Sequence, residues 1–217
     1  MTVELVLRVI VDSTAPDPAG LDRAAEAIRA GGIVALPTDT LYGLAADPFS
    51  DAAVRRLASV KGRTFARALP LIAADLAQIV AQLGELPTLA RILAARFWPG
   101  PLTLLVPAPD GVAAEVSGGT GRLGVRVPAH AVARGLCHAS GRVLTATSAN
   151  ITGRTATRDP DDVMAWFGSE VDVLLDGGMT PGGPPSTIVD VSAIEPRLVR
   201  AGAVPWEAVL ACMRHER

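Results

Sequence analysis

Residues 33–44 read IVALPTDTLYGL, and this stretch decides the fold class. Its first four residues are all apolar, which is the pattern of a short strand buried on both faces of its sheet. The chain then passes directly to Thr38, Asp39 and Thr40, so polar side chains gather where the strand ends. The stretch therefore predicts a buried strand that leads to a group of polar residues.

Helices are expected on both sides of this strand in the sequence. Before it, Asp17 and Pro18 supply an N-cap and a first-turn proline, and Gly31-Gly32 ends the helical pattern. After it, Ser50 can cap a helix that runs to about Lys61. The apolar positions of the first helix recur at helical spacing, at Leu21, Ala24, Ala25 and Ile28.

The rest of the chain continues to alternate strands with helices. Strands are expected within residues 1–10 and over residues 69–73, 102–106, 123–127, 143–147, 171–175, 186–191 and 198–200. Helices are expected from residue 75, from residue 87, over 131–138 and 161–167, and from about residue 206. This order predicts a single α/β domain over residues 1–217, with a mixed parallel and antiparallel sheet flanked by helices.

Composition limits the classes of function. Hydrophobic residues make up 49% of the 217 residues, enough for a sizeable core, and no run is long enough to span a bilayer. The net charge of −2 argues against a surface that binds nucleic acid throughout, although a local basic pocket remains compatible with it. The two cysteines, Cys137 and Cys212, have neither metal-site nor redox spacing, so free thiols in a reducing cytoplasm are expected.

Lys61 is the only lysine of the chain, and every other basic residue is an arginine. An ammonium is a compact point charge that fits among phosphate oxygens where a planar guanidinium does not. Arg63 follows two residues later, across Gly62, and the pair is expected to project into a loop as the helix ends. Lys61 is therefore a candidate phosphate ligand. The alternative is a solvated lysine that complements the helix dipole.

Other familiar motifs are incomplete. Gly178 and Gly183 are spaced like the glycines of G-x-x-x-x-G-K-[ST], but Pro184 stands in the lysine position. Ser148 lacks both a G-x-S-x-G context and a histidine nearby in the sequence, so a serine hydrolase fits poorly. The histidines are scattered, so no metal site built from protein ligands is expected: His130, His138 and His215.

What remains is a set of hydroxyls, one amide and several cations near strand ends and loops. Arg126 stands out because it interrupts an otherwise apolar strand, and Arg200 ends another strand in the same way. Taken singly, each of these residues has an ordinary interpretation as a cap or a turn. The set comprises Thr38, Thr40, Lys61, Arg63, Arg126, Ser148, Asn150, Ser186 and Arg200.

Seven segments together resemble the YrdC-like family of threonylcarbamoyl-AMP synthases, in order and across nearly the whole chain. They are residues 37–44, 61–63, 98–103, 125–128, 148–150, 186–190 and 200–203. The resemblance implies a twisted α/β sheet with a concave nucleotide-binding cavity, in the short form without a further C-terminal domain. It implies a nucleotidyltransferase that joins L-threonine, bicarbonate and ATP into threonylcarbamoyl-AMP and pyrophosphate. The product would pass to a separate transferase that modifies tRNA.

The resemblance also assigns roles by position. It implies that Lys61 and Arg63 act in catalysis and that Arg126 pairs with the threonine carboxylate. Mg²⁺ would arrive with ATP, and weak contact with tRNA is expected. The ATP-binding residues would be Lys61, Arg63, Arg67, Ser148, Asn150 and Arg200, and the threonine-binding residues Thr38, Thr40, Arg126 and Ser186.

Two departures from the family pattern and two alternatives stay open. Thr64 replaces a usual proline, and Ala73 and Ala74 stand where some members place a histidine that contacts threonine. One alternative is an RNA-binding module that uses the same basic patch, against which the few aromatic residues and the acidic balance argue. The other is a paralogue for a different carbamoylation, such as the related domain of hydrogenase maturation proteins.

Overall fold

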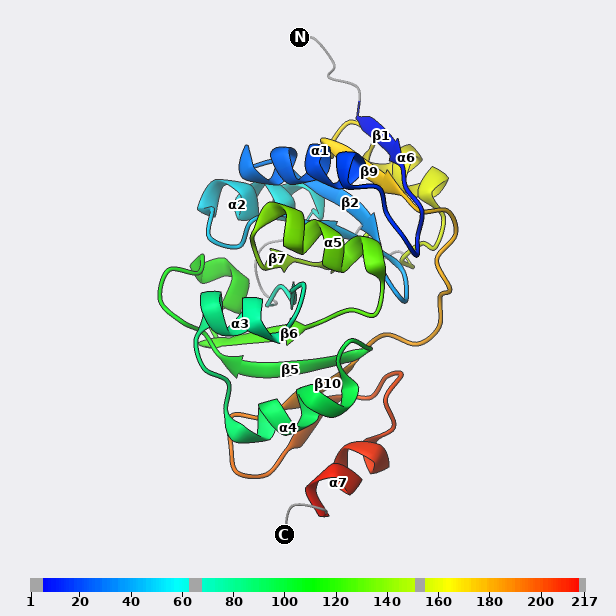
Figure 1. The fold of residues 1–217 in the computed structure, drawn as a ribbon. Coiled ribbons are helices and arrows are strands. Elements are labelled where there is room, and N and C mark those ends of the chain that lie inside the picture. Colours follow the sequence, from blue (N-terminus) through cyan, green and yellow to red (C-terminus); the bar gives the residue numbers. More distant parts are fainter. Residues whose placement is uncertain (1–5, 63–67, 151–154, 215–217) are drawn as a thin grey trace.

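The computed structural model describes residues 6–62, 68–150 and 155–214, and these residues form two sheets with helices around them (Figure 1). The strands are β1 Leu7–Ile10, β2 Val34–Pro37, β3 Tyr42–Ala45, β4 Leu71–Ile72, β5 Leu102–Pro107, β6 Arg122–Arg126, β7 Leu144–Thr145, β8 Thr147–Ser148, β9 Val173–Asp176, β10 Thr187–Asp190 and β11 Arg197–Arg200. The helices are α1 Pro18–Arg29, α2 Asp51–Val60, α3 Leu76–Leu83, α4 Thr88–Phe97, α5 Ala131–Ser140, α6 Pro160–Phe167 and α7 Trp206–Arg214. A short 3₁₀ helix, η1, covers Ala114–Ser117.

The IVALPTDTLYGL stretch forms the hairpin of β2 and β3, and all eight residues of these two strands are buried. Strand β2 pairs antiparallel with β3 on one side and parallel with β9 on the other. The five-stranded sheet has the order β1-β9-β2-β3-β8. The predicted buried strand is confirmed, and its end places residues 38–41 in the turn between β2 and β3.

Helices α1 and α5 cover one face of the five-stranded sheet (Figure 1). The predicted apolar face of α1 is buried there against β2, β9 and α5. Asp17 stands at the N-cap of α1 but makes no side-chain capping bond, whereas Ser50 caps α2 through a bond from Ala53 N at 3.3 Å. Close helix packing follows from the small residues Ala24 and Ala25 on the buried face.

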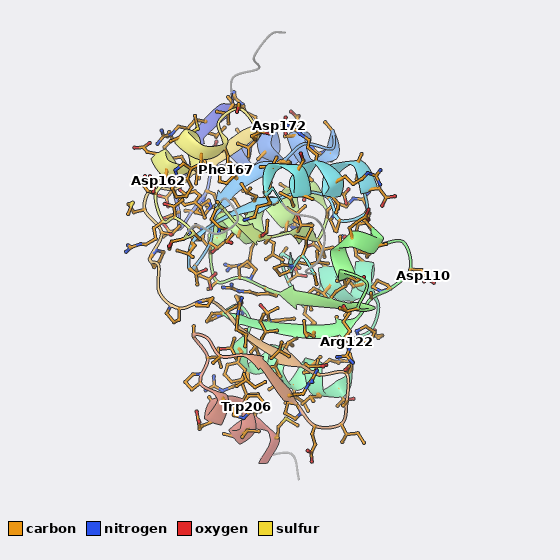
Figure 2. All side chains as sticks on the ribbon, turned by 180° about the vertical axis from the view of Figure 1, so that it is seen from behind. Asp110, Arg122, Asp162, Phe167, Asp172 and Trp206 are labelled. Atoms are coloured by element: carbon orange, nitrogen blue, oxygen red, sulfur yellow. The ribbon has the colours of Figure 1, made fainter. Side chains whose placement is uncertain are left out.

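A larger core joins the other face of this sheet to the second sheet. Phe167 of α6 points into it, while Asp162 on the same helix lies at the exterior (Figure 2). On α4 the buried residues are Leu89, Ala90, Leu93 and Ala94. Helix α4 otherwise faces α7, and Ile92 and Phe97 on that side are only half-buried.

The expectation of one sheet is wrong, because the strands form two sheets. The strand predicted over residues 143–147 is divided between them. Strand β7 pairs with β4 in a six-stranded sheet of order β11-β10-β5-β6-β4-β7, while β8 pairs with β3 in the five-stranded sheet. The break falls at Ala146, whose N–H donates to Pro70 O at 2.7 Å. One continuous run therefore supplies a strand to each sheet.

Thr145 fixes this crossover by a buried hydroxyl. Its Oγ1 accepts a hydrogen bond from Ala46 N at 2.8 Å and also lies 3.2 Å from Ala46 O. We expect Thr145→Val to cost about 1–3 kcal/mol, because it leaves the buried Ala46 N–H without this acceptor. For a chain of this size that lowers the melting temperature by roughly 2–12 °C. Thr145→Ser keeps the hydroxyl, so its melting temperature should fall clearly less. Equal melting temperatures of the two variants would contradict the prediction.

No helix in the described part of the chain is long and apolar enough to cross a membrane.

Candidate active site

Lys61 turns inward rather than into a loop, which corrects the sequence-based expectation. It is the C-cap of α2, and its N–H still bonds to Leu57 O at 3.1 Å. Lys61 thus continues the face of α2 that already carries Val54, Leu57 and Ala58 into the core. Only 1% of the residue is exposed, so the alternative interpretation, a solvated lysine at the helix end, is wrong. The backbone turns away only at Gly62, where φ is +58°.

The ammonium of Lys61 holds the segment that follows β8. Its Nζ donates to Ser148 O, to Asn150 O at 2.7 Å and to Asn150 Oδ1 at 2.8 Å. Ser148 Oγ donates to the same Asn150 Oδ1 at 2.6 Å. These three residues form the lysine cluster. In this cluster the side chains of Ser148 and Asn150 meet, and all the oxygens named here are uncharged.

Arg126 lies at the end of β6, where it is buried and held on two sides. Its Nε donates to Gly100 O at 2.8 Å, and its Nη2 forms an ion pair with Asp39 Oδ1. Gly100 fits because a Cβ at this position would stand 2.3 Å from Phe97 O. The turn at residues 98–101 therefore fixes the guanidinium, and the sequence offered no signal that Asp39 would be its partner.

Arg200 is the last residue of β11 and hydrogen-bonds to Ser186, directly before β10. Its Nη2 donates to Ser186 O at 2.8 Å and to Ser186 Oγ at 3.0 Å, and Ser186 Oγ lies 2.8 Å from Thr103 Oγ1. A Cβ on Gly202 would stand 2.2 Å from Pro185 O, so only glycine lets this segment approach so closely. Thr103 is a residue of this group that sequence reasoning missed, because only the pairing of β5 with β10 brings it there.

Thr38 and Thr40 flank Asp39 in the β2–β3 turn. Their hydroxyl oxygens lie 3.2 Å apart, and Thr38 Oγ1 donates to Leu41 O at 2.7 Å. Thr40 O accepts bonds from Thr180 Oγ1 at 3.0 Å and Gly182 N at 2.8 Å. The loop between Gly178 and Gly183, whose glycine spacing resembles a phosphate-binding motif, thus stabilises this turn.

Of the two guanidiniums in this region, Arg126 pairs with the carboxylate of Asp39, whereas the hydrogen bonds described for Arg200 go to Ser186. Burial lowers the pKa of Arg126 from its usual value, and the charge of Asp39 opposes this shift. Burial also lowers the pKa of Arg200, and the positive charge of Arg126 adds to that effect. Asp39, Arg126, Ser186 and Arg200 form the arginine cluster. Its positive charges are mutually repulsive, so it favours an added anion.

Strand β3 connects the two clusters. Gly43 pairs with Ser148 across β3 and β8, and a Cβ on Gly43 would stand 3.8 Å from Thr38 Cγ2. The structure therefore brings Ser148 of the lysine cluster and Thr38 beside Asp39 to the same strand.

Arg63 and Arg67 lie outside the described residues, so their predicted roles stay predictions. No group of three or more His, Cys, Asp or Glu side chains in the described residues could hold a metal ion. A groove of about 660 Å³ lies between α4 and α7 and is lined by none of the predicted site residues. The expected concave nucleotide cavity likewise stays a prediction.

Sequence comparison places this arrangement among known proteins. The Sua5/YciO/YrdC family model, described as "Telomere recombination", matches residues 26–202. The chain belongs to this family. Similar relatives of the Sua5/YciO/YrdC family include threonylcarbamoyl-AMP synthases from Pyrococcus abyssi, 39% identical over 186 residues, and Halorhodospira halophila, 40% identical over 173 residues. These alignments cover 86% and 80% of this chain, 55% of the Pyrococcus protein and 91% of the Halorhodospira protein.

Solved structures of the family have the same fold. The crystal structure of P. abyssi Sua5 complexed with L-threonine matches with a TM-score of 0.88 and 35% identity, covering 94% of this chain and 61% of that one. E. coli YciO matches with a TM-score of 0.84 over 94% of this chain and all of its own; at 22% identity it supports the fold alone. The α/β fold with mixed sheets flanked by helices is confirmed.

Proposed function

We propose that this protein is an L-threonylcarbamoyladenylate synthase, which converts ATP, L-threonine and bicarbonate into threonylcarbamoyl-AMP and pyrophosphate. The observation that carries the proposal is the burial of the single lysine against Ser148 and Asn150, beside a strand that leads to the arginine cluster. Relatives bearing this name match most of the chain, and one solved relative is complexed with L-threonine.

ATP is assigned to the lysine cluster and its neighbours. A phosphate oxygen that approaches Lys61 would replace an uncharged acceptor with an anionic one, which gives a shorter and stronger hydrogen bond. Ser148 Oγ and the Asn150 amide are hydrogen-bonded to each other beside Lys61, and both can orient the nucleotide. Arg63, Arg67 and Arg200 would offset the remaining negative charge, and Mg²⁺ would arrive bound to ATP as part of the substrate.

Threonine is assigned to the arginine cluster. Arg126 offers its remaining N–H groups to the carboxylate, a planar anion that a guanidinium can bind with two hydrogen bonds. Ser186 Oγ lies beside Arg200, and the hydroxyls of Thr38 and Thr40 flank Asp39. These polar groups suit the α-carboxylate and the hydroxyl of threonine.

The chemistry needs no covalent enzyme intermediate. The amine of threonine reacts with bicarbonate to give a carbamate, whose oxygen attacks the α-phosphorus and releases pyrophosphate. Catalysis then rests on positioning the two substrates and on neutralising charge. Lys61 and Arg63 would stabilise the leaving pyrophosphate, and Arg200 the α-phosphate.

The wider assignments follow from this reaction. The product would be consumed by a separate threonylcarbamoyl transferase for tRNA modification, with weak tRNA contact by this protein. We propose a cytoplasmic location and one domain over residues 1–217. An RNA-binding module or a paralogue for another carbamoylation would not release pyrophosphate in response to threonine.

We expect pyrophosphate release to require both L-threonine and bicarbonate. The test measures pyrophosphate after incubation with MgATP, omitting one substrate at a time, and identifies the nucleotide product by mass spectrometry. L-Serine and L-valine serve as controls, because the first lacks the methyl group and the second the hydroxyl. Release that persists unchanged without threonine or bicarbonate would reduce the protein to an ATP hydrolase and refute the proposal.

A further inference from the structure

A buried histidine nitrogen near the arginine cluster has no hydrogen-bond partner. Among the buried side-chain nitrogen and oxygen atoms of the described residues, His130 Nδ1 is the one without a hydrogen bond. An unmade bond of this kind destabilises the folded state, so it calls for a compensating role. A neutral imidazole with an unused Nδ1 lone pair is a base.

The strand that carries Arg126 leads directly to this histidine. His130 is the N-cap of α5 and follows Arg126 by four residues, across the connection from β6. It interacts electrostatically with Asp39, the carboxylate that holds Arg126, and with Arg134 on its own helix. Asp39, from the β2–β3 turn, pairs with the guanidinium, and its charge also acts on the imidazole.

Burial, more than these neighbours, keeps His130 neutral. Burial lowers the pKa of His130 from its ordinary value of 6.5; Asp39 opposes the shift, and Arg134 adds to it. The imidazole is then unprotonated at pH 7 and can accept a proton. Once protonated, it would be stabilised by the carboxylate of Asp39.

We propose that His130 is the general base of the reaction and accepts the proton that is released when the amino group of threonine reacts with bicarbonate. This inference rests on the proposed function. Written with its charges, the step is R–NH₃⁺ + HCO₃⁻ + His130 → R–NH–COO⁻ + H₂O + His130–H⁺. Two N–H bonds and one C–O bond break, and one C–N bond forms. One of the two protons leaves with the hydroxide of bicarbonate as water, and the other passes to the imidazole.

Asp39 is a positioning residue in this step. An amino acid whose carboxylate is bound by Arg126 carries its α-ammonium only two bonds away from that carboxylate. Asp39, already paired with Arg126, offers the negative charge toward which this ammonium would turn. The ammonium is thus directed to the side of the site where His130 lies.

The test compares His130→Gln with His138→Gln, an exposed histidine on the same helix. We expect His130→Gln to lower bicarbonate-dependent pyrophosphate release roughly 100-fold, as for loss of a general base, and His138→Gln to match the unaltered protein. The reverse reaction, in which threonylcarbamoyl-AMP and pyrophosphate form ATP, should stay within about threefold in both variants. It needs no base, because the released carbamate decomposes in solution.

The pH profile gives a second readout. In the unaltered protein, activity should rise with pH through the lowered pKa of His130, so the acid limb lies below pH 6.5. In His130→Gln this limb should vanish, and the deficit should shrink at high pH as free amine becomes available from solution.

Each remaining outcome counts against the proposal. A forward rate and acid limb that survive in His130→Gln would overturn it. Equal loss of the forward and reverse reactions, in His130→Gln and in a His130→Asn variant alike, would make His130 structural. If the unaltered protein is inactive in both directions, the proposed function fails and the inference fails with it.

Discussion

Lys61→Met should lose at least about 100-fold in turnover, the largest effect expected of a single change at the nucleotide side. Methionine is close to lysine in length but has no ammonium, so the hydrogen bonds to Asn150 and any bond to phosphate disappear together. Each hydrogen bond to a charged group contributes about 1.5–3 kcal/mol, and 1.36 kcal/mol is a tenfold change in rate. The measurement is pyrophosphate release at saturating MgATP, beside a melting curve.

Two further variants separate charge from shape. Lys61→Arg keeps the charge, yet a larger planar head must enter a fully buried space, so we expect a stability loss of about 1–3 kcal/mol and a ten- to hundred-fold drop in turnover. Arg55→Met alters an exposed cation of the same helix and should change neither quantity. Full activity in a stable Lys61→Arg protein would refute the role of a point-charge ligand.

Arg126→Met should abolish efficient use of threonine and also destabilise the fold. It leaves the half-buried Asp39 without its guanidinium, and breaking a fully buried ion pair in this way costs about 3–5 kcal/mol, which is the upper limit here. Because the proposed partner of Arg126 is a carboxylate, the KM for threonine should rise at least about 100-fold, while ATP binding stays within about threefold. Steady-state kinetics with threonine and calorimetric titration with ATP measure the two effects.

The double variant Asp39→Asn/Arg126→Met provides the control for folding. It removes both charges, so most of the lost stability should return, while the use of threonine remains lost. Recovery of threonine use in this folded double variant would show that Arg126 does not bind the carboxylate.

The sequence predicted what depends on local patterns. The apolar run of β2, the helical spacing in α1 and the cap at Ser50 each encode one element through neighbouring residues, and these elements are present. The uniqueness of Lys61 correctly drew attention to it. The predicted direction of the Lys61 side chain was wrong because the buried face of α2 extends one residue beyond the helix, which composition does not reveal.

Long-range pairing was beyond the sequence. Asp39 and Arg126 are far apart in the chain, and only the arrangement of the two sheets brings them together. The division of residues 143–147 between the sheets depends likewise on which strands, β3 and β4, lie on either side of the run. Thr103 and His130 went unrecognised because no local motif distinguishes them from an ordinary strand residue and an ordinary helix start.

The crossover at residues 144–148 also bears on how the molecule unfolds. A strand from each sheet belongs to one short run, so melting either sheet withdraws a strand from the other, and the two should come apart in one cooperative transition. The lysine cluster ties down the end of this run. A nucleotide bound there binds the folded state alone, and its binding energy would therefore raise the melting temperature of both sheets together.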